Sequence, residues 1–294
     1  MLDLKRMCEN ICSAIAEDAP TTNPRFTYSY LTDIINAEYR KVLNTLLHYP
    51  DTEFMVRWQD FVADASAPYY SYFYVPTRFV QLLKIYYLSA DGNKIETKQW
   101  RTEQATHLDN TGEYYYWLMG NRIYFPTTGT YRIIYKEKPP SLHFGTMQFI
   151  EEDPLTNSQI RFASVATGGA VVSEDDYYDG ADVHIISGTG AGQTRRITAY
   201  AGSTKVATVN PAWTLAPAET SIYCIYPVIP EINEDVIYFG AIVRIKDNTV
   251  AQLYLQDYYD AYKQFTDTLK LRDANATRGL FKGVDTEDRT VEFF

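Results

Sequence analysis

A glycine-rich segment at residues 188–193 has the composition closest to that of a ligand-binding loop. Gly188, Gly190 and Gly192 are followed by Gln193. A phosphate-binding loop requires a lysine after its last glycine, and the dinucleotide-binding pattern requires a third glycine where Gln193 stands. Neither pattern is met. Because the sequences on both sides are strand-like, we expect this segment to connect two strands rather than to hold a nucleotide.

Two runs of carboxylates, residues 151–153 and 174–176, could bind a divalent cation or serve a hydrolase. A glycosidase needs two carboxylates at a set separation across a cleft, which adjacency in the sequence does not provide. Consecutive carboxylates are usually solvated, so we expect both runs to lie in exposed loops. A hydrolase therefore remains an open alternative without a candidate pair of residues.

The histidines and cysteines are too scattered to predict a metal or catalytic site. The histidines are His48, His107, His143 and His184, and the cysteines are Cys8, Cys12 and Cys224. Cys8 and Cys12 share a face of a predicted helix, but no further ligands lie near them. We expect reduced, structural thiols of a protein made in a cytoplasm. The sequence thus predicts no catalytic residue, no cofactor and no metal, and a protein that is not an enzyme.

The elements that could position any site change in character along the chain. Apolar residues at helical spacing predict helices at 2–17 and 28–48, and two helical stripes between 233 and 271 that Asp247-Asn248 interrupts weakly. Alternating patterns and turn residues predict strands and hairpins between 54 and 136, and loop from 141 to 159. A compact set of short strands from 160 to 226 then interrupts the chain.

We expect an α+β fold. Its frame would be a helical bundle of N- and C-terminal helices, joined to a β region and an inserted small antiparallel β domain. The predicted domains are a core of helices and β region at 1–154 and 229–272, the inserted domain at 155–228, and an extended tail at 273–294.

Tyrosine and charge are the unusual features of the composition. The 26 tyrosines are clustered, which suits interfaces that are part wet and part apolar, or reflects the strand preference of aromatic residues. A net charge of −10 argues against wrapping DNA but is compatible with a channel through which DNA slides. No apolar run is long enough to predict a membrane span, and no signal peptide is indicated.

Several passages resemble the head-to-tail adaptor proteins of short-tailed bacteriophages. They include the stripe from Leu31 to Leu47, and the Pro-Phe passage of Tyr74, Pro76 and Phe79 that leads into a strand. Further matches are the exit from Tyr131 through Pro139-Pro140 to Leu142, and the helix start with Pro230, Glu231, Asp235, Gly240 and Ala241. The strands around 186–209 resemble a small domain inserted in various phage structural proteins.

The resemblance implies a virion structural protein at the head-to-tail junction, assembled in the host cytoplasm. Such proteins form a ring, typically of about twelve neighbouring copies, that docks under the portal protein and continues the DNA channel. The inserted domain would face tail or nozzle proteins or fibres. Residues 273–294 would be the portal-docking arm. Its expected anchors are Arg278, Leu280, Phe281, Phe293 and Phe294.

An alternative is a carbohydrate-binding or cell-wall-associated phage tail protein. Aromatic side chains stack on sugars, and this alternative predicts that residues 155–228 bind glycans through an exposed aromatic groove. The tryptophans that could contribute are Trp58, Trp100, Trp117 and Trp213.

Overall fold

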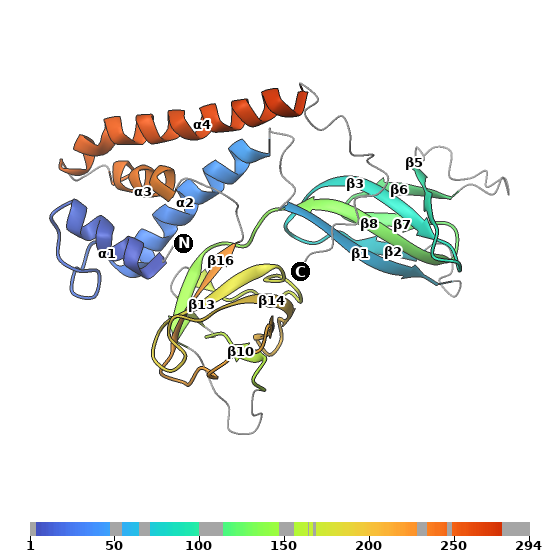
Figure 1. Ribbon diagram of the computed structural model, residues 1–294, viewed down its shortest axis with the longest axis horizontal. Coiled ribbons are helices and arrows are strands. Elements are labelled where there is room, and N and C mark those ends of the chain that lie inside the picture. The colour runs from blue at the N-terminus through green and yellow to red at the C-terminus, as the bar shows by residue number, and fades with distance from the viewer. Residues whose placement is uncertain are drawn as a thin grey trace. The chain divides into compact units, whose positions relative to one another are not determined.

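The computed structural model describes residues 4–47, 55–64, 71–99, 114–146, 156–163, 165–166, 169–227, 234–245 and 249–277. The chain forms two compact units. The first contains residues 1–52 and 140–294, and the second contains residues 53–139. Each unit has its own sheets, so each is described by itself (Figure 1).

The first unit contains the helices. They are α1 (Leu4–Ala14), α2 (Tyr28–Leu46), α3 (Glu234–Val243), the 3-10 turn η3 (Ala251–Tyr254) and α4 (Leu255–Thr277). Thr27 caps α2 by accepting a hydrogen bond from the Tyr30 N–H, which satisfies one of the free donors at a helix start. The apolar stripes of the helices face inward, and α3 packs against both α2 and α4 (Figure 1).

The first unit also contains a six-stranded antiparallel sheet. In spatial order its strands are β10 (Gln159–Arg161), β15 (Val206–Asn210), β14 (Thr194–Ala201), β13 (Ala181–Ser187), β16 (Ile222–Pro227) and β9 (His143–Thr146). Between β10 and β13 in the chain, two further short strands pair with each other, β11 (Val165–Ala166) and β12 (Gly169–Ala170). Inward-facing residues such as Phe162, Val183, Ile197 and Tyr223 form its core. Asn36 of α2 exchanges two hydrogen bonds with the Leu142 backbone just before β9, which ties the helices to this sheet.

The second unit is built from two sheets. The first sheet has the order β1 (Val56–Ala63), β8 (Gly129–Glu137), β3 (Phe79–Leu88) and β4 (Lys94–Glu96). The second has the order β2 (Ser71–Tyr74), β7 (Arg122–Phe125), β6 (Tyr115–Met119) and β5 (Lys98–Gln99). Their inner faces meet through aromatic contacts, with Phe125 of β7 lying 5.4 Å from Phe61 and 4.3 Å from Tyr131 between ring centres. The unit is therefore a β-sandwich with one shared core.

The predicted hairpins of the second unit are confirmed. β3 pairs with β4 across the turn at 90–93, and β6 pairs with β7 across Gly120-Asn121. Gly120 has a φ of +61°, a conformation that tight hairpin turns demand and that glycine adopts readily.

The expected fold class, a helical bundle carrying a small β domain, is wrong. The described chain is mostly β, with sheets in both units and the helices confined to one of them. Long amphipathic helices give a strong periodic signal, whereas short strands give a weak one. β9, for example, has only four residues. Strand β9 and the start of β10 also lie in the stretch expected to be loop.

The predicted domain boundaries near 155 and 228 lie outside the described residues, so the division into core and inserted domain stays a prediction. Of the predicted tail, residues 273–277 form the end of α4, and 278–294 lie outside the described residues.

Candidate functional site

A row of exposed aromatic side chains follows the outer face of the β2–β7–β6 sheet. Phe73, Ile123 and Phe125 point into the core of the sandwich, so the residues that alternate with them point outward. The register places Tyr72 beside Tyr124, and Tyr74 beside Arg122. We name these four residues the tyrosine strip. Its edge is well exposed, with Tyr72 38% and Tyr74 51% accessible.

Arg122 lies against two rings of this strip, Tyr72 and Tyr74, which also contact each other edge to face with their centres 5.0 Å apart. Its guanidinium carbon lies 4.5 Å from the ring centre of Tyr72 and 4.8 Å from that of Tyr74, which is cation–π geometry. Its Nη2 donates a 2.8 Å hydrogen bond to the Tyr74 hydroxyl. Hydrogen bonding to Tyr124, followed by the nearby tyrosine hydroxyls, raises the pKa of Arg122. Within the part of the chain that the structure describes, no carboxylate pairs with this cation.

On the neighbouring strand β6, two side chains lie next to the tyrosine strip. Trp117 stacks on Tyr124 with ring centres 5.4 Å apart and planes 5° from parallel. Met119 lies opposite Arg122 in the register and is exposed. The surface therefore grades from the buried Trp117 to exposed tyrosines around a cation, a composition typical of protein interfaces.

The outer face of the other sheet also carries an arginine over an aromatic ring, but this arginine pairs with a carboxylate. Trp58 of β1 is 58% exposed, and the guanidinium carbon of Arg132 lies 4.3 Å from its ring. Here Arg132 donates two hydrogen bonds of 2.8 Å to the carboxylate of Asp60. That bidentate pair holds the pKa of Asp60 below its ordinary value. The cation on this face is thus neutralised within the unit.

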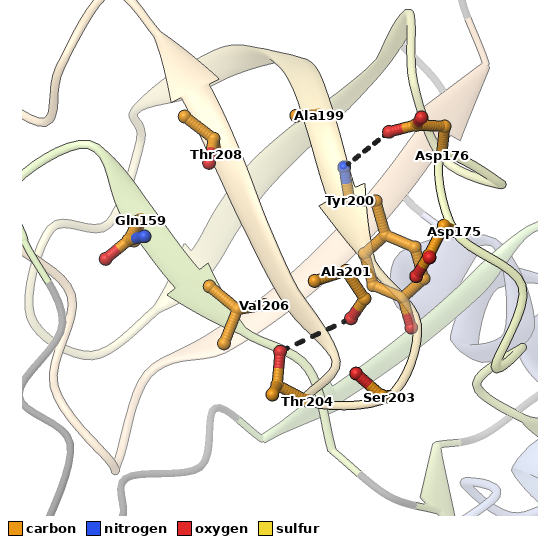
Figure 2. A pocket seen from close by; sticks show the side chains of 10 residues that line it. All are labelled: Gln159, Asp175, Asp176, Ala199, Tyr200, Ala201, Ser203, Thr204, Val206 and Thr208. Atoms are coloured by element: carbon orange, nitrogen blue, oxygen red, sulfur yellow. Dashed lines mark hydrogen bonds between the residues drawn. The ribbon is translucent and has the colours of Figure 1, made fainter.

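An open hollow of about 500 Å³ lies over one end of the six-stranded sheet (Figure 2). Its walls include Gln159, Thr208, Ala199 and the 203–204 turn, and its acidic side chains come from the predicted carboxylate run at 174–176. Asp175 accepts a hydrogen bond from the Gly202 N–H at 2.8 Å, and Asp176 accepts one from the Tyr200 N–H at 3.2 Å. Both carboxylates therefore fasten this loop to β14. The other run, 151–153, lies outside the described residues.

The glycine-rich segment is a connector, as predicted. It joins the antiparallel strands β13 and β14, and Gln193 is used for internal bonding. The Gln193 Oε1 accepts from the Thr214 N–H at 2.9 Å, while its Nε2 donates to the Leu215 carbonyl at 2.8 Å. Gln193 thus fastens the segment to the 212–215 loop.

A buried carboxylate on α2 is a feature that the sequence analysis missed. Glu38 is 4% exposed and accepts a hydrogen bond from Nε of Arg244, while the Lys41 ammonium lies 3.9 Å away. Lys41 also donates to the Tyr258 hydroxyl on α4. Gly240 on α3 leaves room for Glu38, since a Cβ there would come within 2.9 Å of its carboxylate. This network joins three helices, and in sequence Glu38 resembles any polar residue between two apolar ones.

His143 of β9 is fully enclosed by the core of the six-stranded sheet. Tyr178, Phe162 and Tyr223 surround its ring, with centres 5.2, 6.0 and 5.9 Å away. Burial lowers the pKa of His143 to about 3, so the neutral imidazole is the stable form. The ring is a packing element in this core.

The remaining predicted candidates are placed as follows. The three cysteines are buried and form no disulfide with one another, and their expected reduced state stays a prediction. His184 bonds to Thr194 within the sheet, and His48 and His107 lie outside the described residues. Among the residues that the structure describes, no three His, Cys, Asp or Glu side chains are placed to share a metal ion.

The predicted portal-docking residues, Arg278, Leu280, Phe281, Phe293 and Phe294, all lie outside the described residues.

No model of a known protein family matches the chain, and no curated protein matches it. None of the helices in the described ranges combines the length and apolar character needed to cross a membrane.

Proposed function

We propose that the protein is a structural assembly protein of a virion, whose task is to bind other proteins rather than to catalyse a reaction. The observation that carries this proposal is the tyrosine strip, in which exposed tyrosines surround an arginine that no described carboxylate neutralises. Tyrosine and arginine are the residues that contribute most often to binding hot spots. An exposed aromatic row of this kind is typical of a recognition surface.

The finer part of the proposal is a head-to-tail adaptor. It is supported by the sequence passages that resemble such proteins, from the Leu31–Leu47 stripe to the helix start at 230–241. In this role, copies of the chain would form a ring under the portal protein and offer a platform to tail components. DNA would pass through without sequence-specific binding, for which a net charge of −10 is suitable.

Internal bonding of the polar side chains favours assembly over hydrolysis. Asp175, Asp176 and Glu38 each accept hydrogen bonds that fasten one segment to another. A hydrolase needs carboxylates that face a substrate across a cleft. Among the described residues, the hollow in Figure 2 offers only carboxylates that already serve the backbone.

The test is the mass of the purified protein by light scattering, alone and after mixing with its portal ring. The adaptor proposal expects a complex of defined stoichiometry with the portal. Deletion of 278–294 leaves α4 complete, so the truncated protein should stay folded and fail to join the portal. Normal assembly of the truncated protein would overturn the assignment of the docking arm, and indifference to the portal would overturn the adaptor.

Carbohydrate binding is a second candidate because Trp58 exposes more than half of its surface. The site, however, differs from the one expected. Within 155–228, the described rings of Trp213, Tyr178 and Tyr200 are buried. A glycan array probed with the full-length protein, and with Trp58→Ala as the control, decides this candidate.

A further inference from the structure

We propose that the tyrosine strip binds an acidic segment of a protein partner, with a carboxylate of that partner pairing with Arg122. This inference names the partner chemistry at the surface on which the proposed function rests. Arg122 offers five N–H donors, and hydrogen bonds to the Tyr74 and Tyr124 hydroxyls use two of them within the strip. The other donors remain to form the two parallel bonds that an arginine makes with a carboxylate.

The strip prepares Arg122 for such a partner. The rings of Tyr72 and Tyr74 hold the guanidinium at 4.5 and 4.8 Å, so less side-chain freedom is lost when a ligand arrives. The other members of the strip are tyrosines, which place phenol groups rather than carboxylates beside the guanidinium. Arg122 therefore presents a positive charge, held in place, on a chain whose net charge is −10.

Charge and geometry favour a protein carboxylate over other ligands. The net negative charge of the chain opposes a nucleic acid, whose many phosphates need a basic face. A sugar would have to stack on ring faces against which the guanidinium already lies. A single carboxylate can bind the guanidinium without moving it away from the rings. The exposed Tyr74 and Met119 offer apolar area around it.

At the Arg132 site, a carboxylate of the same unit already pairs with an arginine that lies over an aromatic ring. Arg132 lies over an aromatic ring as Arg122 does, but Asp60 already accepts two parallel hydrogen bonds from its Nε and Nη2. A partner carboxylate at Arg122 would reproduce the arrangement that Asp60 provides there. Arg132 is therefore the matched control position for Arg122.

The experiment uses the immobilised full-length protein and a random linear peptide library as the probe. Peptides selected by the wild-type protein should be enriched in Asp and Glu. The enrichment should persist with Arg132→Gln and disappear with Arg122→Gln. Selection of apolar peptides equally by the wild type and Arg122→Gln, or no selection at all, overturns the inference. Arg122-dependent binding on a glycan array without acidic peptides overturns it in favour of a sugar.

An enriched peptide then allows a double-mutant cycle by calorimetry. Arg122→Gln should weaken its binding about tenfold or more, because a charge-assisted pair is lost. Replacing the acidic residue of the peptide by its amide should cost a similar factor, and no further loss should follow in the Arg122→Gln protein. Additive losses would contradict a direct pair. Arg122→Lys keeps the charge without the planar fork and should bind with intermediate affinity.

Folding and the proposed function are checked separately. Arg122 is partly exposed and lies outside the core, so the thermal midpoint of Arg122→Gln should stay close to that of the wild type, as a guard against misfolding. Portal binding by light scattering tests the adaptor independently. If acidic peptides bind but the protein does not join the portal, only the adaptor proposal is overturned. If the protein joins the portal but the tyrosine strip selects no acidic peptides, only the inference is overturned.

Discussion

The two outer faces of the β-sandwich carry the same kind of contact and leave it in different states. On one face Arg132 lies over Trp58 and is neutralised by Asp60, and on the other Arg122 lies against the rings of Tyr72 and Tyr74 without a described carboxylate. An aromatic–arginine contact is therefore not in itself a binding site. An arginine that already pairs with a carboxylate of its own chain completes the contact internally. An arginine without such a carboxylate can bind one from a ligand.

Removal of the shared core should have the largest effect, because both faces depend on it. Phe125 is 1% exposed and lies between the two sheets, so Phe125→Ala should destabilise the second unit by about 3–5 kcal/mol. Peptide-level hydrogen exchange should report faster opening throughout 53–139. Phe162→Ala, in the core of the first unit, is the matched control and should leave those segments protected. Loss of protection in both units from either change would contradict two separate cores.

Acidification should weaken the first unit while both faces of the sandwich persist. His143 has a pKa of about 3 when folded and about 6.5 when unfolded, so below pH 6.5 the unfolded state binds more protons. At pH 5 the cost is about 2 kcal/mol of unfolding free energy.

The Asp60–Arg132 pair behaves differently because the pKa of Asp60 is lowered. Its contribution is complete above the ordinary pKa of 3.8 and is lost only as pH falls through the lower folded value. Urea unfolding at pH 7 and pH 5, with His143→Asn as the control, measures the effect. An undiminished pH dependence in that variant would assign the effect to another group.

Opening the neutralised face should have the smallest effect on stability. Asp60 and Arg132 are partly exposed, so Asp60→Asn should cost at most about 1 kcal/mol. It should, however, free Arg132 for a carboxylate from outside. Placed in an Arg122→Gln background, Asp60→Asn should restore part of the selection of acidic peptides. A protein that stays indifferent would indicate that the tyrosine rings, rather than the uncompensated charge, define the recognition surface.

Local sequence patterns predicted individual helices and hairpins of this protein correctly, but they did not predict the relative amounts of helix and sheet. The hairpins at 90–93 and 120–121 follow from turn residues between alternating strands, and the helix at Tyr28–Leu46 follows from its apolar stripe. The predicted balance between helix and sheet is wrong because the helices were expected to form the frame, whereas the strands build complete sheets of their own in both units. A strand as short as β9, with four residues, offers almost no periodicity.

The candidate surface could be predicted only in part. Clustered tyrosines suggested an interface, but which of them are exposed depends on the face each one occupies in its strand. The contrast between the two arginines was beyond sequence reasoning. Asp60 and Arg132 are far apart in the chain and meet only because β1 and β8 pair in register. Glu38 and Arg244 meet across a still longer separation, for which no local signal exists.

The discontinuity of the first unit has a consequence for the order in which the protein matures on the ribosome. Tyr238 and Tyr254, near the end of the chain, donate to the carbonyls of Asn10 and Ala14 in the first helix. The sandwich at 53–139 is continuous and can close while translation proceeds. The parts of α1 and α2 that α3 covers must wait until α3 emerges. The nascent chain therefore carries its sandwich finished and its first helices unfinished, and it is in this interval that a chaperone would find a hydrophobic helix to hold.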